Sequence, residues 1–204
     1  MLFFAFCFII RKNISQLYSK RSYKVRIISG SARGLKLLTP DGINTRPTAD
    51  RVKEALFSSL TDKISSSLVL DAFSGSGALG IEALSRGARR AVMTESDPKA
   101  FSLCRENLKK ARLADRGEVI LTDALSYIDK TSEFFDIIFL DPPYASGLYE
   151  PFLKKAEKHL APGGIIIVEY EEKNLPVIPG FYSVTKEKKY GRVHLSYLTG
   201  VEQH

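Results

Sequence analysis

From residue 67 onward, short runs of apolar residues alternate with segments in which apolar residues recur every three or four positions. The first pattern predicts buried β-strands and the second predicts amphipathic helices. Because the strands are apolar throughout, we expect a doubly wound α/β fold, with a parallel sheet covered by helices on both faces and ligands at the carboxyl ends of the strands. The predicted strands are Leu68–Phe73, Ala91–Glu95, Val119–Thr122, Phe135–Leu140 and Ile165–Tyr170.

Helix boundaries follow from turn and capping residues. Asp97 directly precedes Pro98, which is the order expected of an N-cap and the first position of a helix. Gly87 ends the helix predicted over Gly77–Arg86. The predicted helices are Gly77–Arg86, one beginning at Pro98, Asp123–Ile128 and Leu148–Leu160.

The two flanks of this alternating region have a different pattern. Residues 25–47 predict a small β-hairpin, and Thr48–Leu60 predicts a helix after Pro47. In the tail, Tyr182–Thr185 and Val193–Leu198 predict an antiparallel hairpin that closes one sheet edge, with residues 186–192 as its loop. We therefore expect a hairpin and helix over residues 25–62 and the main domain over residues 63–200.

The chain has 204 residues and a formal charge of +7, but its first 24 residues hold five basic residues and no acidic ones. The remaining 180 residues carry only +2, so net charge is a poor argument that the folded part binds nucleic acid. The apolar run Met1–Ile10 is too short to span a bilayer, which needs about 20 residues. Residues 1–24 are interpreted either as an organellar transit peptide or as sequence ahead of a true start at Val25. We expect a cytoplasmic protein without stable membrane association, or an organellar protein if residues 1–24 are a transit peptide.

The chain has only two cysteines, Cys7 and Cys104. Two are too few for a disulfide framework or a metal cage, so we expect no metal site. Cys104 shares helical spacing with Phe101 and Leu108, which predicts a place in the core.

A glycine-rich turn follows the first predicted strand of the sheet. Gly75, Gly77 and Gly80 form G-x-G-x-x-G, and Glu95 ends the next strand 20 residues after Gly75. This spacing fits a nicotinamide dinucleotide, but glycines that let the backbone approach a ligand suit any nucleoside cofactor.

The acidic residue Asp71 separates these two interpretations, because it lies where a dinucleotide would place its pyrophosphate. S-adenosylmethionine has no phosphate and carries an ammonium and a sulfonium, which carboxylates attract. We therefore predict that Asp71, Phe73, Gly75 and Gly77 contact S-adenosylmethionine. Glu95 is expected to bind its ribose hydroxyls and Asp123 its adenine amine. The alternative is that the three acids cap helices or solvate loops.

The fourth strand leads into Asp141-Pro142-Pro143-Tyr144, the most specific signal in the chain. The exocyclic amine of a base is a poor nucleophile because its lone pair is delocalised into the ring. Hydrogen bonds from its N–H groups to the Asp141 carboxylate and the Pro142 carbonyl would direct that lone pair at a methyl group. Tyr144 offers a flat face for a base removed from its stack. The alternative is a proline-rich turn with a surface aromatic.

Three blocks of this sequence resemble the RsmD-like bacterial methyltransferases, over about residues 25–198. Residues 25–34 are similar to the opening hairpin of that family, residues 46–57 to its most distinctive block and residues 72–88 to its cofactor loop and helix. The resemblance implies a class I, Rossmann-like methyltransferase fold with a seven-stranded, mostly parallel sheet and an N-terminal hairpin extension. It also implies S-adenosylmethionine as donor and the N2 of a guanine in 16S ribosomal RNA, within a partly assembled small subunit, as the target. We expect a monomer.

Contacts to RNA are expected from several polar residues of the N-terminal region and the tail. Arg46, Thr48 and Arg51 are predicted between cofactor and target, and a capped, solvated helix start is the alternative. An electrostatic footprint is predicted for the remaining cations, for which ordinary surface solvation is the alternative. These cations are Arg33, Lys36, Lys186, Lys188, Lys189 and Arg192.

Three other functions compete with guanine methylation. A DNA or RNA adenine-N6 methyltransferase would share Asp-Pro-Pro-Tyr, but such enzymes usually need a larger target-reading domain than this chain allows. An NAD-dependent dehydrogenase would have to accommodate Asp71 beside a pyrophosphate. A catalytically silent RNA-binding module would have no need of the three acids together with Asp141.

Overall fold

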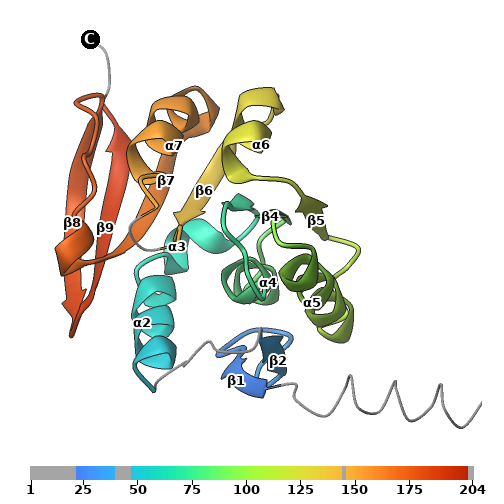
Figure 1. Ribbon diagram of the computed structural model, residues 1–204. Helices are drawn as coiled ribbons and strands as arrows, with labels where there is room; N and C mark the ends of the chain where they lie inside the picture. Colours follow the sequence, from blue (N-terminus) through green and yellow to red (C-terminus); the bar gives the residue numbers. More distant parts are fainter. Residues whose placement is uncertain (1–21, 40–46, 144–145, 202–204) are drawn as a thin grey trace, which may run out of the picture.

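Seven strands follow from the apolar runs of the sequence and from the tail. The computed structural model describes residues 22–39, 47–143 and 146–201. Its large sheet consists of β3 (Leu68–Asp71), β4 (Arg90–Glu95), β5 (Gly117–Leu121), β6 (Phe135–Leu140), β7 (Leu160–Glu171), β8 (Tyr182–Tyr190) and β9 (Val193–Gly200). The strand order is β5-β4-β3-β6-β7-β9-β8, in which β9 is antiparallel to both neighbours and the other pairings are parallel (Figure 1).

Helices cover both faces of this sheet, as the alternating pattern predicts (Figure 1). The helices are α2 (Pro47–Ser58), α3 (Thr61–Ile64), α4 (Ala78–Ser85), α5 (Pro98–Lys110), α6 (Ala124–Lys130) and α7 (Tyr149–Ala156), with 3-10 turns η1 (Glu157–His159) and η2 (Glu172–Asn174). One buried cluster lies between the sheet and α2, α4 and α5, and contains Cys104, as predicted. A second cluster lies between the sheet and α6 and α7. The doubly wound arrangement is confirmed.

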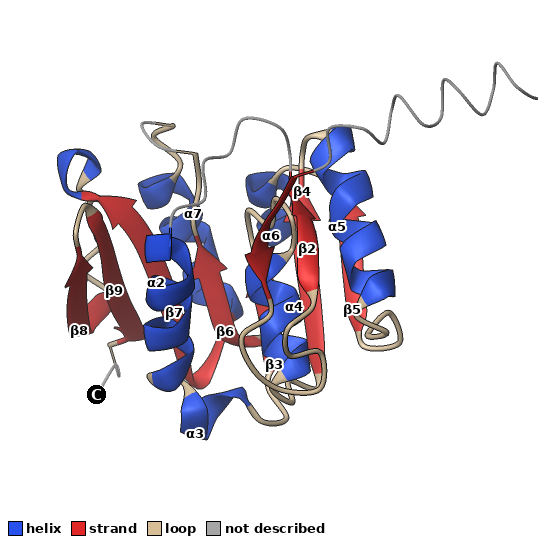
Figure 2. Cartoon of the chain, turned by 90° about the horizontal axis from the view of Figure 1, so that it is seen from below, coloured by secondary structure: helices blue, strands red, loops and turns tan. Residues whose placement is uncertain are grey.

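The N-terminal hairpin forms a separate two-stranded sheet of β1 (Ser22–Arg26) and β2 (Lys36–Thr39), which lies beside α4 and α5 (Figure 2). The prediction of a hairpin in this region is confirmed. Its first strand begins at Ser22 and so crosses the boundary that we placed between residues 24 and 25.

The predicted loop over residues 186–192 is wrong, because β8 continues to Tyr190. Its backbone pairs with β9 from Lys186 opposite Tyr197 to Tyr190 opposite Val193. Charged side chains suit the exposed faces of an edge strand, where they also discourage pairing with other chains. The helix predicted over Leu148–Leu160 ends at Ala156, after which a 3-10 turn leads into β7.

Two kinds of feature are absent from the residues that the structure describes. None of the helices there combines the length and the apolar character that crossing a membrane requires. The same residues contain no group of three or more His, Cys, Asp or Glu side chains arranged to hold a metal ion.

Candidate active site

A cavity of about 670 Å³ opens at the carboxyl edge of the parallel strands. Its size is within the range of small-molecule and cofactor sites. Five chain segments line it, and each lies at the end of a strand or at the start of a helix. They are residues 71–76, 78–79, 94–96, 122–125 and 141–143, together with Leu148.

The glycine turn between β3 and α4 forms one wall. Gly75 and Gly77 have φ angles of +52° and +78°, a conformation that glycine adopts without strain. A Cβ at Gly77 would also lie 2.6 Å from the Cys104 Sγ. The Glu95 Oε2 accepts a hydrogen bond from the Gly75 N–H at 2.9 Å, so the acid at the end of β4 holds the turn in place. Glu95 lines the cavity from there.

Asp71 is almost completely buried at the end of β3, with 3% of its surface exposed. Its Oδ2 accepts a hydrogen bond from the Gly80 N–H at 2.9 Å. Burial raises the pKa of Asp71 to about 7, and although the Gly80 bond lowers it, the negative charges of Asp141 and Glu95 add to the rise. A cation in the cavity would relieve this repulsion, whereas a pyrophosphate would add to it.

The sequence offered two alternative roles for Asp123, a helix cap and a partner of the adenine amine. Its Oδ1 accepts a hydrogen bond from the Ser126 N–H at 2.8 Å, which makes it the N-cap of α6 and lowers its pKa. The residue also lines the cavity. The capping geometry is therefore present, and contact with an adenine amine stays a prediction. Phe73 lines the same cavity, and its ring lies 6.1 Å from that of Phe152.

The Asp-Pro-Pro corner lines the same cavity as the glycine turn. In the sheet, Asp71 pairs with Phe139, so Asp141 comes two residues beyond that pair on the neighbouring strand. The prediction that the corner and the glycine turn share one sheet edge is confirmed. Burial raises the pKa of Asp141 well above its ordinary value, and the charge of Glu169 contributes. Tyr144 lies outside the described residues.

Glu169 was not predicted from the sequence as a site residue, although its position on β7 corresponds to that of Asp141 after β6. Leu140 of β6 pairs with Val168 of β7, so the residues that come next along the two strands are Asp141 and Glu169. With Glu169 included, each of the five strands β3 to β7 has a carboxyl group near its carboxyl end or directly after it. A single acid within the apolar strand Ile165–Tyr170 was the signal in the sequence.

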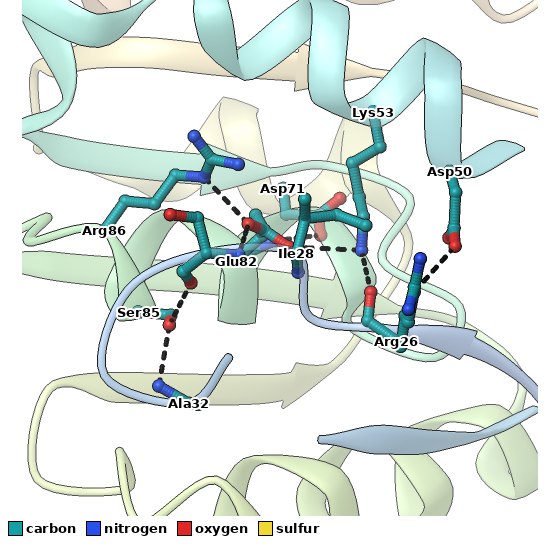
Figure 3. Close-up of polar contacts among 11 residues, drawn as sticks. Arg26, Ile28, Ala32, Asp50, Lys53, Asp71, Glu82, Ser85 and Arg86 are labelled. Carbon is teal, nitrogen blue, oxygen red and sulfur yellow. Dashed lines mark hydrogen bonds and ion pairs between the residues drawn. The ribbon is translucent and has the colours of Figure 1, made fainter. Parts of the chain in front are cut away.

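A buried ionic cluster fixes the N-terminal hairpin to the core (Figure 3). The Glu82 side chain of α4 is fully buried and contacts Lys53 of α2 at 3.2 Å and Arg86 at 2.7 Å. It also accepts hydrogen bonds from the backbone N–H groups of Ile28 and Ser29. This cluster ties the hairpin and α2 to the helix that begins at the glycine turn. The residues are far apart in sequence, and no motif in the sequence indicated the contact.

The described residues among those predicted to bind RNA are found in three places. Arg33 and Lys36 are exposed on the N-terminal hairpin, whereas Lys189 and Arg192 are exposed at the far edge of the sheet. Lys189 binds Glu172 at 3.0 Å, and Lys188 donates to Ser59 at 2.8 Å. Arg51 is exposed on α2, and Thr48 lies in the first turn of that helix. Arg46 lies outside the described residues.

Comparison with known proteins shows that the chain is similar to methyltransferases over most of its length. The family model described as Conserved hypothetical protein 95 matches residues 25–199. Ribosomal RNA small subunit methyltransferase D of Escherichia coli strain K12 is 40% identical over 175 residues, which cover 84% of this chain and 88% of that protein. The protein of the same name from Haemophilus influenzae is 37% identical, over 83% of this chain and 91% of its own. The solved structure of yhhF from Escherichia coli covers 88% of this chain and 99% of its own, with a TM-score of 0.78 and 37% identity.

A parallel sheet with one antiparallel strand inserted next to its edge, and a glycine turn after its first strand, defines a class I, Rossmann-like methyltransferase. Because the family model matches most of the chain, the family itself is also shown. The chain belongs to the family described as Conserved hypothetical protein 95, and its curated relatives confirm the resemblance to RsmD-like methyltransferases.

Proposed function

We propose that this chain transfers a methyl group from S-adenosylmethionine to the exocyclic N2 of a guanine in small-subunit ribosomal RNA. The observation that carries the proposal is that the glycine turn and the Asp141-Pro142-Pro143 corner line one cavity, among carboxyl groups. The names of the relatives support small-subunit ribosomal RNA as the substrate.

The residues of the cavity fit a nucleoside that carries positive charge. Asp71 is buried without an ion-pair partner among the described residues, and burial together with the charges of Asp141 and Glu95 raises its pKa. Asp71, Phe73, Gly75, Gly77, Glu95 and Asp123 would hold S-adenosylmethionine. When bound, this cofactor supplies an electrophilic methyl group on a positively charged sulfur.

The corner residues would prepare the amine that receives the methyl group. The Asp141 carboxylate and the Pro142 backbone carbonyl accept hydrogen bonds from the two N–H groups of the amine. These hydrogen bonds direct the nitrogen lone pair toward the cavity. Pro142 is buried and Pro143 follows it, so two fixed φ angles stiffen the backbone that presents the carbonyl. We further propose that Tyr144 stacks on the extruded base, and that Arg46, Thr48 and Arg51 lie between base and cofactor.

The RNA substrate would be presented as part of an incompletely assembled small subunit, on which a monomer of this chain acts. Arg33, Lys36, Lys189 and Arg192 would contact phosphates at two separate places on such a particle.

Labelled methyl transfer tests this function. The chain is incubated with methyl-labelled S-adenosylmethionine and small subunits, or their free RNA, from cells that lack the corresponding gene, and the modified nucleotide is mapped. We expect label on the N2 of one guanine, with more transfer to particles than to free RNA. Label on adenine N6 would instead identify the competing amino-methyltransferase, and absence of label from all RNA would refute the proposal.

A further inference from the structure

The carboxyl groups of Asp141 and Glu169 are neighbours across two parallel strands. Val168 pairs with Leu140 on β6, and β7 continues through Glu171. Side chains alternate along a strand, and Ile167 packs in the cluster beneath α2 and α4. Glu169 therefore lies on the same face of the sheet as Ile167, beside the residue that follows β6.

Neither carboxyl group has a compensating partner. No ion pair or side-chain hydrogen bond to another described residue is found for Asp141 or Glu169, and both residues are only partly exposed. Burial raises the pKa of Glu169 to about 7. For Asp141, burial and then the charge of Glu169 act in the same direction. Two like charges this close in a poorly hydrated site cannot both form at neutral pH without a large cost.

Among the described residues, no cation forms an ion pair with either carboxyl group. On the β3 side lies Asp71, itself acidic, with Glu95 beyond it. On the β9 side Glu169 pairs with Leu195, which is apolar, and Lys188, opposite Leu195 on β8, donates a hydrogen bond to Ser59 at 2.8 Å. From α7, the Tyr149 hydroxyl donates to the Glu169 backbone oxygen at 2.9 Å.

The helix α2 over this face carries two cations among its described side chains, Lys53, which is buried, and Arg51, which is exposed. Lys53 is held by Glu82, and Asp50 is paired with Arg26. Arg51 and Glu54 of this helix are exposed.

We propose that Asp141 and Glu169 share one proton at neutral pH, and that Glu169 is a positioning residue which sets the pH at which Asp141 becomes an acceptor for the target amine. The proposal rests on the proposed function for its role, but the pairing of the two carboxyls exists without a substrate. It also gives a reason for an acid within an otherwise apolar strand. Removing the charge of Glu169 lets Asp141 ionise at lower pH, and removing that of Asp141 does the same for Glu169, because coupling between two titrating groups is reciprocal.

Carbon-13 NMR of the side-chain carboxyls of the full chain tests the pairing directly. The Asp141 signal is identified by its loss in Asp141→Asn, and the Glu169 signal by its loss in Glu169→Gln. In Glu169→Gln we expect Asp141 to titrate at least about one pH unit lower than in the wild type. In Asp141→Asn, Glu169 should shift in the same direction.

Glu171→Gln is the matched control. It removes an equal charge two residues along the same strand, where Glu171 contacts Lys173 at 3.3 Å, and it should leave the titration of Asp141 almost unchanged. If Asp141 titrates at the same pH in wild type and Glu169→Gln, the proposal is wrong.

The pH dependence of methyl transfer tests the positioning role. The acidic limb of the rate should move to lower pH in Glu169→Gln and stay in place in Glu169→Asp, which keeps the charge. A lower rate in both variants with an unmoved limb would show a structural role and overturn the proposal. If the wild-type chain methylates no RNA, the proposed function fails, and the NMR titration still decides whether the two carboxyls share a proton.

Discussion

The Glu95 carboxylate at the end of β4 accepts a hydrogen bond from the Gly75 N–H in the turn after β3, at 2.9 Å. Its other oxygen accepts from the Asp97 N–H at 2.8 Å, at the start of α5. One acid thus joins the glycine turn to the next helix and lines the cavity between them. This arrangement explains why an acidic residue and a glycine turn 20 residues apart belong to one site.

Asp141→Ala should lower the methyl-transfer rate by about 10²- to 10⁴-fold, the usual effect of losing a positioned polar group. Asp141→Asn should retain more activity, because its amide oxygen still accepts a hydrogen bond. Single-turnover rates with S-adenosylmethionine and small subunits measure both. Equal losses would mean that a carboxylate able to accept a proton is required.

Asp71→Asn should stabilise the empty protein at pH 8 and weaken its binding of S-adenosylmethionine. The raised pKa means that ionising Asp71 is harder in the folded protein than in the unfolded chain, so this residue reduces stability as pH rises from about 4 to about 7. The melting temperature of the variant should exceed that of the wild type by a few degrees at pH 8, with little difference at pH 4. An equal decrease at both pH values would argue that the bond from Gly80 matters more than the charge.

Glu82→Gln should destabilise the fold by about 3–5 kcal/mol, because it leaves the buried Lys53 ammonium without its counter-charge. Glu106→Gln is the matched control: Glu106 forms a half-exposed pair with Lys110 at 3.4 Å within α5, and its loss should cost less than about 1 kcal/mol. Urea unfolding of both variants gives the free energies. Similar costs would show that the cluster around Glu82 is no more important than a surface pair.

Gly30→Ala and Gly34→Ala separate backbone strain from close packing in the hairpin. Both glycines have left-handed φ angles, +85° and +83°. A Cβ at Gly30 would lie 1.8 Å from the Ser85 carbonyl oxygen, whereas a Cβ at Gly34 meets nothing within 4 Å. Gly34→Ala should therefore cost about 1–2 kcal/mol, and Gly30→Ala clearly more. Hydrogen exchange at the Ser31 N–H, which donates to that oxygen, should rise only in Gly30→Ala. Equal stabilities would contradict the packing of the hairpin on α4.

Arg192→Ala should weaken binding to the RNA of the small subunit more than Lys189→Ala does. Arg192 is exposed in the turn after β8, whereas Lys189 is already paired with Glu172. The slope of log affinity against log salt should fall by up to about one for Arg192→Ala, as expected for loss of one phosphate contact. An unchanged slope would place this edge of the sheet away from the RNA.

Much of the fold and site could be predicted because the relevant information is local. Apolar runs give the strands, and the carboxyl ends of parallel strands necessarily meet at one edge, which brings Asp71, Glu95 and Asp141 to the same cavity. Asp97 was correctly predicted as a helix cap, since its side chain accepts a hydrogen bond from the Ala100 N–H.

The rest depends on contacts between distant segments. The burial of Lys53 against Glu82 arises only when α2 packs beside α4, and Glu169 becomes a neighbour of Asp141 only through the register of β6 and β7. The charged residues of β8 indicated a loop, because their pairing with β9 could not be read from local composition.

Titration calorimetry tests most directly whether the cavity accepts a positively charged nucleoside rather than a dinucleotide. The chain is titrated at pH 8 with S-adenosylmethionine, with its demethylated product and with NAD, and Asp71→Asn serves as the variant that lacks the buried charge. We predict that S-adenosylmethionine and its product bind, that NAD does not, and that Asp71→Asn loses more affinity for the charged donor than for the neutral thioether product. Tight binding of NAD, or equal losses for donor and product, would contradict the account.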